Sequence, residues 1–217
     1  MNLLLATNII LELLIVVRLW KTIQRAYAGF AVYLLISTIS STFLLALSIM
    51  QLAPQYRATW IITELILAIP GGVISWEAVR NLRRVGKQLP DAITVMAAIG
   101  VMAALVVWGY SHYGYAYDRA LEQCFAIKAS IEFFFSVMLV SMLVTGHIPG
   151  RVRSLEFRHG VLLAGYFLLN SFTFFGYGLA SARDRMYDFK PLSYFLLITC
   201  TVCLIGWLEI FGRRKPA

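Results

Sequence analysis

Long apolar stretches alternate with short polar breaks along the whole chain. Each stretch has about 20 residues or more, which is the length that a helix needs to cross the hydrocarbon core of a bilayer. Pro54, Pro90, Pro149, Gly150 and Pro191 mark the breaks or the starts of stretches. The pattern predicts an all-α protein, a bundle of seven transmembrane helices at residues 2–20, 28–52, 58–80, 91–110, 119–145, 157–181 and 190–212.

The composition agrees with a chain that lies mostly in lipid. Hydrophobic residues make up 60% of the 217 positions and charged residues only 14%, whereas soluble domains are close to half apolar and a quarter charged. The mean hydropathy is +0.75. Because apolar stretches use the whole length, we expect a single transmembrane domain over residues 1–217.

The Lys and Arg residues between the spans predict the orientation, since cytoplasmic loops carry the excess of positive charge. One side of the bundle receives Arg18, Lys21, Arg25, Arg80, Arg83, Arg84, Lys87, Arg151, Arg153, Arg158, Arg213, Arg214 and Lys215. The other side receives only Arg57, Arg119, Arg183, Arg185 and Lys190. The richer side is therefore predicted to be cytoplasmic, with the N-terminus outside and the C-terminus inside.

The same distribution bears on targeting and on partners. The first apolar stretch has no basic residue before it, so we expect a span and not a cleaved signal peptide. The basic side meets anionic lipid headgroups, and nucleic acid is not expected as a partner despite the net charge of +8. We expect a multi-pass protein of the plasma membrane, in particular a bacterial inner membrane, with the lipid bilayer around it.

Four ionisable side chains fall inside the predicted spans, where a charge is costly and normally faces the bundle interior. Glu12 lies in the first span, Glu64 in the third, and Lys128 and Glu132 one turn apart in the fifth. At about 1.5 Å per residue, Glu12 and Lys128 lie roughly 15 Å below the outer ends of their spans, Glu64 about 10 Å and Glu132 about 20 Å. We predict that Lys128 lies within salt-bridge distance of one of these carboxylates.

Two interpretations of this layer stay open. In the structural one, Lys128 and Glu132 neutralise each other, and Asn8, Asn170 and Ser/Thr groups satisfy Glu12 and Glu64 across helices. In the functional one, a ligand or proton site is formed by Glu12, Glu64, Lys128, Glu132 and Asn170. One lysine cannot pair with three carboxylates, so at least one Glu holds a proton or contacts water, and such a group is a candidate functional site.

The third span carries Pro70, Gly71 and Gly72 near its middle. A proline removes one backbone donor and clashes with the preceding turn. We expect the helix to be bent or broken between Ala68 and Val73. The interruption could be a packing kink, or it could be the kind of discontinuous span that forms binding sites in transporters.

Two features concern the arrangement of the spans. Gly100 and Ala104 give span four a small-xxx-small spacing, which suits a scaffold helix or the contact face of a homo- or hetero-oligomer. Spans one and five each carry a mid-span glutamate, and spans three and seven end in the similar sequences WEAVRNLRR and WLEIFGRR. These similarities predict a 3+1+3 arrangement of two parallel repeats with span four as the connector.

Motifs of enzymes and cofactor sites are missing from the sequence. It has no Walker sequence, no GxSxG and no HExxH. His112, His147 and His159 lie in loops or at span ends, unlike mid-membrane haem ligands. Cys200 and Cys203 form a CxxC inside an apolar stretch, where thiols act as small apolar side chains. We therefore expect no enzyme, no catalytic residue, no cofactor and no metal.

Seven spans with the N-terminus outside, in about 217 residues, resemble the sugar-transporting and cargo-receptor proteins of the PQ-loop type in size and topology. The Pro54-Gln55 pair lies in a predicted outer loop, where the motif of that family does not lie, and spans one, two, five and six have no internal proline. No residue role is carried over from that family.

The sequence thus predicts a seven-helix membrane protein that binds or moves a small solute or protons through an intramembrane polar site, as transporters and permeases do. One alternative is a sensor or receptor subunit that signals to a separate partner through its basic loops. Another is a structural or assembly subunit of a larger membrane complex. The ligand itself is not indicated.

Overall fold

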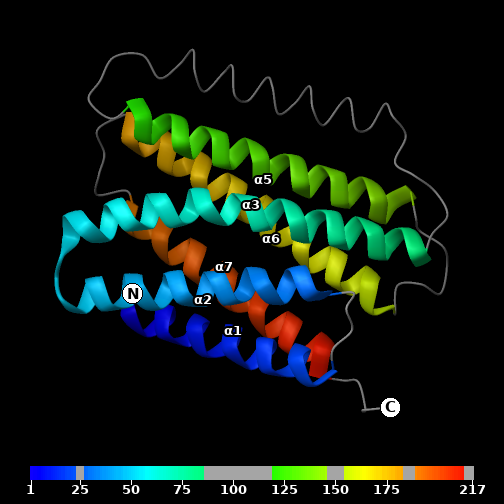
Figure 1. Ribbon diagram of the computed structural model, residues 1–217. Helices are drawn as coiled ribbons and strands as arrows, with labels where there is room; N and C mark the ends of the chain where they lie inside the picture. Colours follow the sequence, from blue (N-terminus) through cyan, green and yellow to red (C-terminus); the bar gives the residue numbers. More distant parts are fainter. Residues whose placement is uncertain (23–26, 86–118, 146–153, 183–188, 213–217) are drawn as a thin grey trace.

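The fold is a bundle of long helices, seen here in a computed structural model that describes residues 1–22, 27–85, 119–145, 154–182 and 189–212 (Figure 1). The described helices are α1 (Asn2–Thr22), α2 (Ala28–Ile49), α3 (Ala53–Val85), α5 (Arg119–Thr145), α6 (Leu155–Ala182) and α7 (Phe189–Gly212). All six are long and apolar enough to cross a membrane. An all-α architecture with membrane-span-like helices is therefore confirmed for this part of the chain.

The six helices correspond to six of the seven predicted spans. The predicted fourth span, 91–110, and its Gly100 and Ala104 lie outside the described residues. The largest difference in length is in α3, which extends beyond the predicted 58–80 at both ends. α2 ends at Ile49, three residues earlier than predicted, because Gln51 takes a left-handed conformation with a φ of 57° and the Leu52 N–H bonds back to the Leu47 carbonyl.

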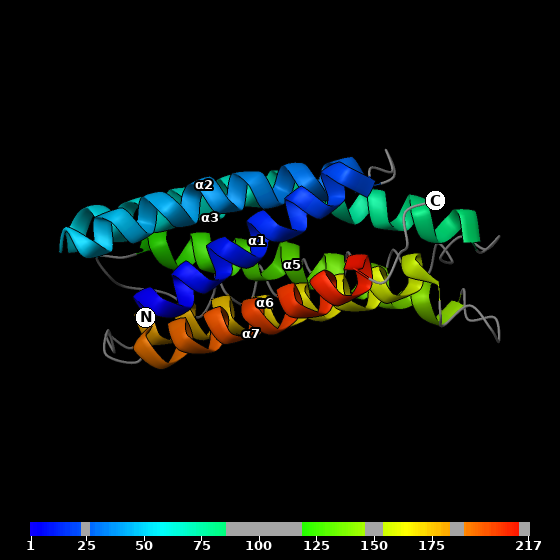
Figure 2. The same ribbon diagram turned by 90° about the horizontal axis from the view of Figure 1, so that it is seen from below.

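The described helices form a closed ring. Each helix packs against the next one in the chain, α3 packs against α5, and α7 packs back against α1. α3 also contacts α6 across the ring. Figure 2 shows how α1 crosses the bundle obliquely, from the start of α7 towards the start of α2.

Two pairs of neighbours in the ring run in the same direction. Along α1 and α7, Asn8 Nδ2 donates to the Leu197 carbonyl and Arg18 Nη1 donates to the Leu208 carbonyl. α3 and α5 also run in parallel, so the last described residue of α3, Val85, and the first of α5 lie at opposite ends of the bundle (Figure 1).

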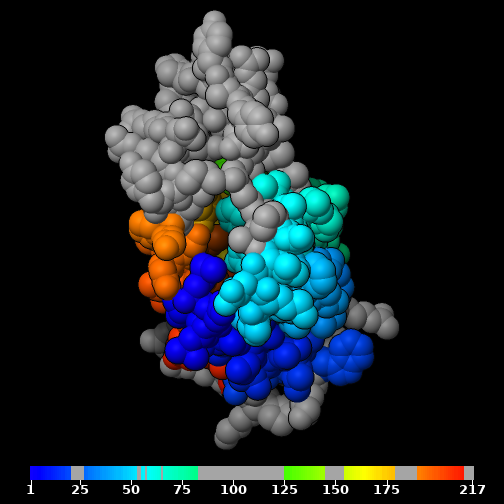
Figure 3. Space-filling view, turned by 90° about the vertical axis from the view of Figure 1, so that its left-hand side faces the viewer, coloured from blue at the N-terminus to red at the C-terminus, as the bar shows by residue number. Residues whose placement is uncertain are grey.

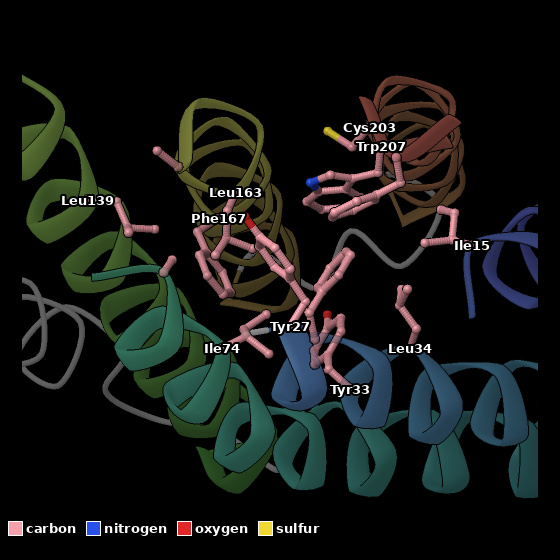
Figure 4. Close-up of a cluster of buried hydrophobic side chains, with 14 of the residues drawn as sticks. Ile15, Tyr27, Tyr33, Leu34, Ile74, Leu139, Leu163, Phe167, Cys203 and Trp207 are labelled. Atoms are coloured by element: carbon pink, nitrogen blue, oxygen red, sulfur yellow. The ribbon is translucent and has the colours of Figure 1, made fainter. Parts of the chain in front are cut away.

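A dense apolar core fills one half of the bundle, the half that holds the ends of α1, α3, α5 and α7 and the starts of α2 and α6. Its fully buried members include Ile15, Phe30, Ile74, Leu139 and Leu163. Figure 4 shows side chains from all six helices converging in this cluster. The described side chains of this half are therefore closely packed against one another.

α3 continues through Pro70 without interruption, from Ala53 to Val85. A break at Pro70, Gly71 and Gly72 is therefore wrong, whereas the other predicted possibility, a bend in a continuous helix, stays a prediction. One proline deletes a single backbone donor, whereas the packing of α3 against α2, α5 and α6 holds the helix on both sides. Ser75 Oγ donates to the Gly71 carbonyl at 2.8 Å within the same turn region.

The first turn of α2 is capped by a side chain from α3. The Gly29 N–H donates to Oε2 of Glu77 at 2.6 Å. A carboxylate is well suited to this place, since the first N–H groups of a helix have no partner within the helix and carry partial positive charge. A Cβ at Gly29 would overlap that carboxylate oxygen, so a larger residue here would displace the Glu77 side chain.

Candidate ligand-binding cavity

A cavity of about 420 Å³ lies in the half of the bundle opposite to the apolar core. It reaches the exposed residues Met1, Lys190 and Tyr194 at the end of the bundle where α1, α3 and α7 begin. Figure 3 faces this end, with the start of α1 in dark blue, α7 in orange and the region joining α2 to α3 in cyan. The volume falls in the range of small-molecule sites, about 300–1,000 Å³.

The wall of the cavity combines leucines with polar and aromatic side chains and comes from five of the six described helices. Its polar, charged and aromatic members are Asn8, Glu12, Ser37, Ser40, Ser41, Tyr56, Trp60, Thr63, Glu64, Tyr166, Asn170, Phe174, Tyr177, Lys190, Ser193, Tyr194 and Cys200. Three of the five predicted site residues, Glu12, Glu64 and Asn170, are among them. Lys128 and Glu132 of α5 are not in the wall and lie behind Glu64.

Lys128 forms ion pairs with two of the carboxylates that lie at a similar depth in the predicted spans. Its Nζ lies 2.8 Å from Oε2 of Glu64 and 3.1 Å from Oε1 of Glu132. It also donates to the backbone carbonyl of Glu64 at 3.1 Å. Asn170 of α6 hydrogen-bonds the Glu132 side chain. The predicted salt bridge is confirmed, while the role of these residues as a ligand or proton site stays a prediction.

Glu12 lies on a different wall and has no charged partner among the described residues. Its carboxyl oxygens contact Ser37 Oγ at 2.6 Å and Thr38 Oγ1 at 3.0 Å, both on α2. Thr38 Oγ1 also lies 2.8 Å from the Leu34 carbonyl. A hydroxyl has one hydrogen, so if Thr38 donates it to Leu34, a protonated Glu12 can donate to Thr38 in turn.

The two asparagines of the cavity wall differ in how many of their side-chain polar atoms have hydrogen-bond partners. Asn8 donates to the Leu197 carbonyl at 3.2 Å and accepts from Thr201 Oγ1 at 2.6 Å. Asn170 is 3% exposed, and its Oδ1 has no hydrogen-bond partner in the part of the chain that the structure describes. A buried carbonyl oxygen without a donor is costly, about 1–3 kcal/mol, so a ligand or a water molecule that supplies a hydrogen is favoured at this point.

Aromatic rings form one side of the cavity. Trp60 stacks on Phe174 with ring centroids 6.1 Å apart and meets the Tyr177 ring edge-on at 5.0 Å. The Nζ of Lys128 lies 4.7 Å from the centre of the Phe174 ring. The rings therefore lie directly beside the ion-paired group.

At the deep end of the cavity wall, Tyr166 is hydrogen-bonded to a tyrosine that lies behind it. The hydroxyls of Tyr33 on α2 and Tyr166 on α6 lie 2.9 Å apart and share a hydrogen bond. Below them the Phe30 ring packs at 4.8 Å from the Trp207 ring and at 4.9 Å from His159. His159 is 1% exposed, so the histidine expected at a span end lies within this aromatic layer. The cavity is thus closed towards the core half.

The sequence interpretation did not single out the serines of α2 or the rings of α3 and α6 as site residues. A signal for the serines was present, because Ser37, Ser40 and Ser41 recur at helical spacing on one side of an otherwise apolar span. Cys200 lines the cavity while Cys203 is in the apolar core. Among the described residues, no group of three or more His, Cys, Asp and Glu side chains could hold a metal ion.

The helices define the class of protein: six described helices with the length and composition of spans support a multi-pass membrane protein. Comparison with known proteins goes no further, because no protein-family model, no curated protein and no solved structure matches the chain. Function must therefore be argued from the cavity.

Proposed function

We propose that this protein is a membrane transporter that receives a small solute in the cavity at the N-terminal end of the bundle. The observation that carries the proposal is the division of the bundle into two halves. One half holds a polar cavity of about 420 Å³ that reaches exposed residues, and the other half is a packed apolar core. A transporter that opens to one side at a time has this asymmetry in each of its states.

The orientation follows from the described basic residues together with the charge rule. Arg18, Arg80 and Arg158 are exposed at the core end of the bundle, far from the mouth of the cavity. Because positive charge favours the cytoplasmic side, the cavity would open to the outside. Residues 91–110 would be the seventh span, since Val85 and Arg119 lie at opposite ends of the bundle and the chain has to return between them.

The packing order also supports the repeat that alternating access would use. α1, α2 and α3 pack in sequence, and α5, α6 and α7 do the same. In such a repeat α1, α2 and α3 are equivalent to α5, α6 and α7. The two remaining contacts of the ring, α1 with α7 and α3 with α5, are then equivalent to each other. Both are parallel pairs, as two parallel repeats require.

The burial of the charges argues against an assembly subunit. Such a subunit would present its intramembrane charges to other chains. Glu12, Lys128 and Glu132 are instead 3%, 4% and 4% exposed within this single chain. The free-energy cost of placing these charges in the membrane is offset by contacts inside the bundle. This favours an internal ligand site over a contact with another chain.

Cysteine labelling from both sides of the membrane tests the proposal without knowledge of the solute. In a background with Cys124, Cys200 and Cys203 replaced by alanine, Ser40→Cys places a thiol in the cavity. We expect an impermeant maleimide to label it from outside, and more slowly from the cytoplasmic side in inverted vesicles. The control is Ser136→Cys, since Ser136 is 1% exposed outside the cavity and bonds the Ala164 carbonyl; it should stay unlabelled.

The outcomes separate the candidate functions. Labelling of Ser40→Cys from both sides supports a transporter. Labelling from the outside alone, after long exposure on both sides, contradicts transport and favours a sensor or receptor. No labelling from either side contradicts an accessible cavity of any kind.

A further inference from the structure

The polar groups at the deep end of the cavity are hydrogen-bond acceptors. Glu12 and Glu64 contribute carboxyl groups, and Oδ1 of Asn170 has no donor among the described residues. Two of the nearby N–H donors, the side chains of Lys128 and Asn8, already have acceptors. Lys128 bonds Glu64 and Glu132, and Asn8 bonds the Leu197 carbonyl. A ligand that fits this set of groups must bring hydrogen-bond donors of its own.

The charges at the deep end of the cavity are unbalanced in the same direction, whereas its mouth holds Lys190 and the N-terminal ammonium of Met1. Glu12, Glu64 and Glu132 are three carboxyl groups, and Lys128 is the one cation among the described side chains at their depth. Lys128 is shared between Glu64 and Glu132. The low dielectric of the bundle makes an uncompensated carboxylate costly, so a proton or another cation is needed for neutrality.

Glu12 is the carboxyl group that this imbalance affects most. From α2 it meets only the hydroxyls of Ser37 and Thr38. From α7, which packs on the other side of α1, the nearest titratable group that lines the cavity is the thiol of Cys200. Across the cavity are Glu64 and the Tyr166 phenol. None of these groups is a cation, so Glu12 either holds a proton or faces a cationic ligand.

The aromatic side of the cavity suits an organic cation. Trp60, Phe174 and Tyr177 line it, and a cation within about 6 Å of such a ring centre is attracted by the ring quadrupole. The ammonium group of Lys128 already lies over Phe174 in this manner. A volume of about 420 Å³ exceeds the need of a bare metal ion and accommodates a small organic molecule.

We propose that the cavity binds a small organic ammonium ion and that this ligand and a proton compete for Glu12. The assignment rests on the proposed function of the cavity as a solute site. The exchange balances in atoms and charge: the protonated Glu12 carboxyl gives its proton to solvent, and the carboxylate that remains accepts a hydrogen bond from the ligand ammonium. The site has the same net charge before and after. Transport of the ligand in one direction and of a proton in the other follows from this exclusion.

Three benzyl compounds of similar size test the charge of the ligand. Benzylammonium is a cation with three donors, benzyl alcohol is neutral and benzoate is an anion. Binding to the purified full chain is followed by tryptophan fluorescence, to which Trp60 in the cavity wall contributes, and by calorimetry. We expect benzylammonium to bind at least tenfold more tightly than the other two, by the cost of unpaired acceptors. A primary ammonium group loses its proton only at alkaline pH, so the probe keeps its charge at acidic and neutral pH, where the measurements are made.

Proton competition gives the second measurement. At pH values below the one at which Glu12 ionises, each increase of one pH unit should raise the affinity for benzylammonium about tenfold. The reason is that one proton leaves Glu12 for each ligand bound. A pH indicator in weak buffer should record up to about one proton released per ligand. Glu12→Gln should abolish both the release and the pH dependence. Glu209→Gln is the matched control, because Glu209 is exposed on α7 and does not line the cavity; it should behave as the parent.

The results distinguish this inference from the proposed function. Equal or tighter binding of benzyl alcohol or benzoate overturns the cation assignment while leaving a solute cavity in place. Proton release that persists in Glu12→Gln overturns the role of Glu12. Absence of binding by all three probes also overturns the cation assignment, and the labelling of Ser40→Cys then decides independently whether the cavity is a transport site.

Discussion

The ammonium group of Lys128 lies 2.8 Å from the carboxylate of Glu64 and joins α5 to α3. The same group reaches Glu132, one turn further along α5, at 3.1 Å. Lys128 is almost fully buried, while the Glu64 side chain keeps 20% of its surface exposed towards the cavity. The lysine therefore fixes one carboxylate at the cavity wall and neutralises a second behind it.

Lys128→Met should lower the stability of the bundle, because it leaves two carboxylates without their cation. Breaking a buried ion pair costs about 3–5 kcal/mol. We expect a lower yield of folded protein and a lower melting temperature in detergent. Adding Glu64→Gln to the lysine variant should restore part of the loss.

The control for this prediction is Lys190→Met, which removes an exposed lysine at the mouth of the cavity. It should have little effect on folding. If Lys128→Met has the yield and melting temperature of the parent, the ion pair does not stabilise the fold, and the shared polar site loses its main support.

Gly29→Ala should destabilise the start of α2. The new methyl group would overlap Oε2 of Glu77, which accepts the Gly29 N–H at 2.6 Å. Displacement of the carboxylate leaves helix N–H groups without a partner, at a cost of about 1–3 kcal/mol. The matched control is Gly165→Ala in α6, where an added Cβ meets no atom within 4 Å. That variant should be as stable as the parent or slightly more, since alanine favours a helix. Thermal melts of both variants check the difference, and equal melting temperatures would contradict the capping role of Glu77.

Tyr33 and Tyr166 should be coupled in a double-mutant cycle. Tyr33→Phe or Tyr166→Phe alone leaves the other hydroxyl without the bond of 2.9 Å. Each single change should cost about 1–3 kcal/mol, whereas removal of both hydroxyls should cost less than the sum. The four melting temperatures measure the coupling. Additive effects of the two changes would show that the deep end of the cavity is not held by this bond.

The orientation predicts which loops an impermeant thiol reagent can reach. We expect the segments 21–27, 81–90 and 146–156, which join or end the helices, to be cytoplasmic. A cysteine at Gly86 should then stay unlabelled in intact cells, while one at Gln55, exposed at the start of α3 near the mouth of the cavity, should be labelled rapidly. Rapid labelling of Gly86→Cys in intact cells would reverse the predicted topology. Both variants need the same cysteine-free background.

Counting residues from the ends of the spans correctly predicted the ion pairs of Lys128. The same count did not show that Glu12 lies apart from Lys128. Counting residues along parallel spans placed the four charged groups in one layer, and the structure has Lys128 on Glu64 and Glu132 as that count allowed. The count could not show that Glu12 faces α2 and bonds Ser37 and Thr38 instead. Depth depends on position along a helix, whereas the partner depends on how the helix is rotated and which helix lies beside it.

For Pro70 in α3, the local sequence predicted an interruption that the structure does not have. Pro70 with Gly71 and Gly72 predicted a break because helix propensity is low at these positions. The structure has a continuous helix, since contacts with α2, α5 and α6 stabilise α3 along both halves. Tertiary packing outweighed a local preference of a few kcal/mol.

The sequence by itself determined the helical class, six spans that the structure describes and the depth of each charged group, because these depend on apolar length and on a fixed rise per residue. Only the tertiary structure decided the order of the ring, the cavity in one half and the core in the other. Spans that are apolar on every side carry little information about which face meets which neighbour. The pairing of Glu12 with α2 and of Lys128 with α3 comes from contacts between helices distant in sequence.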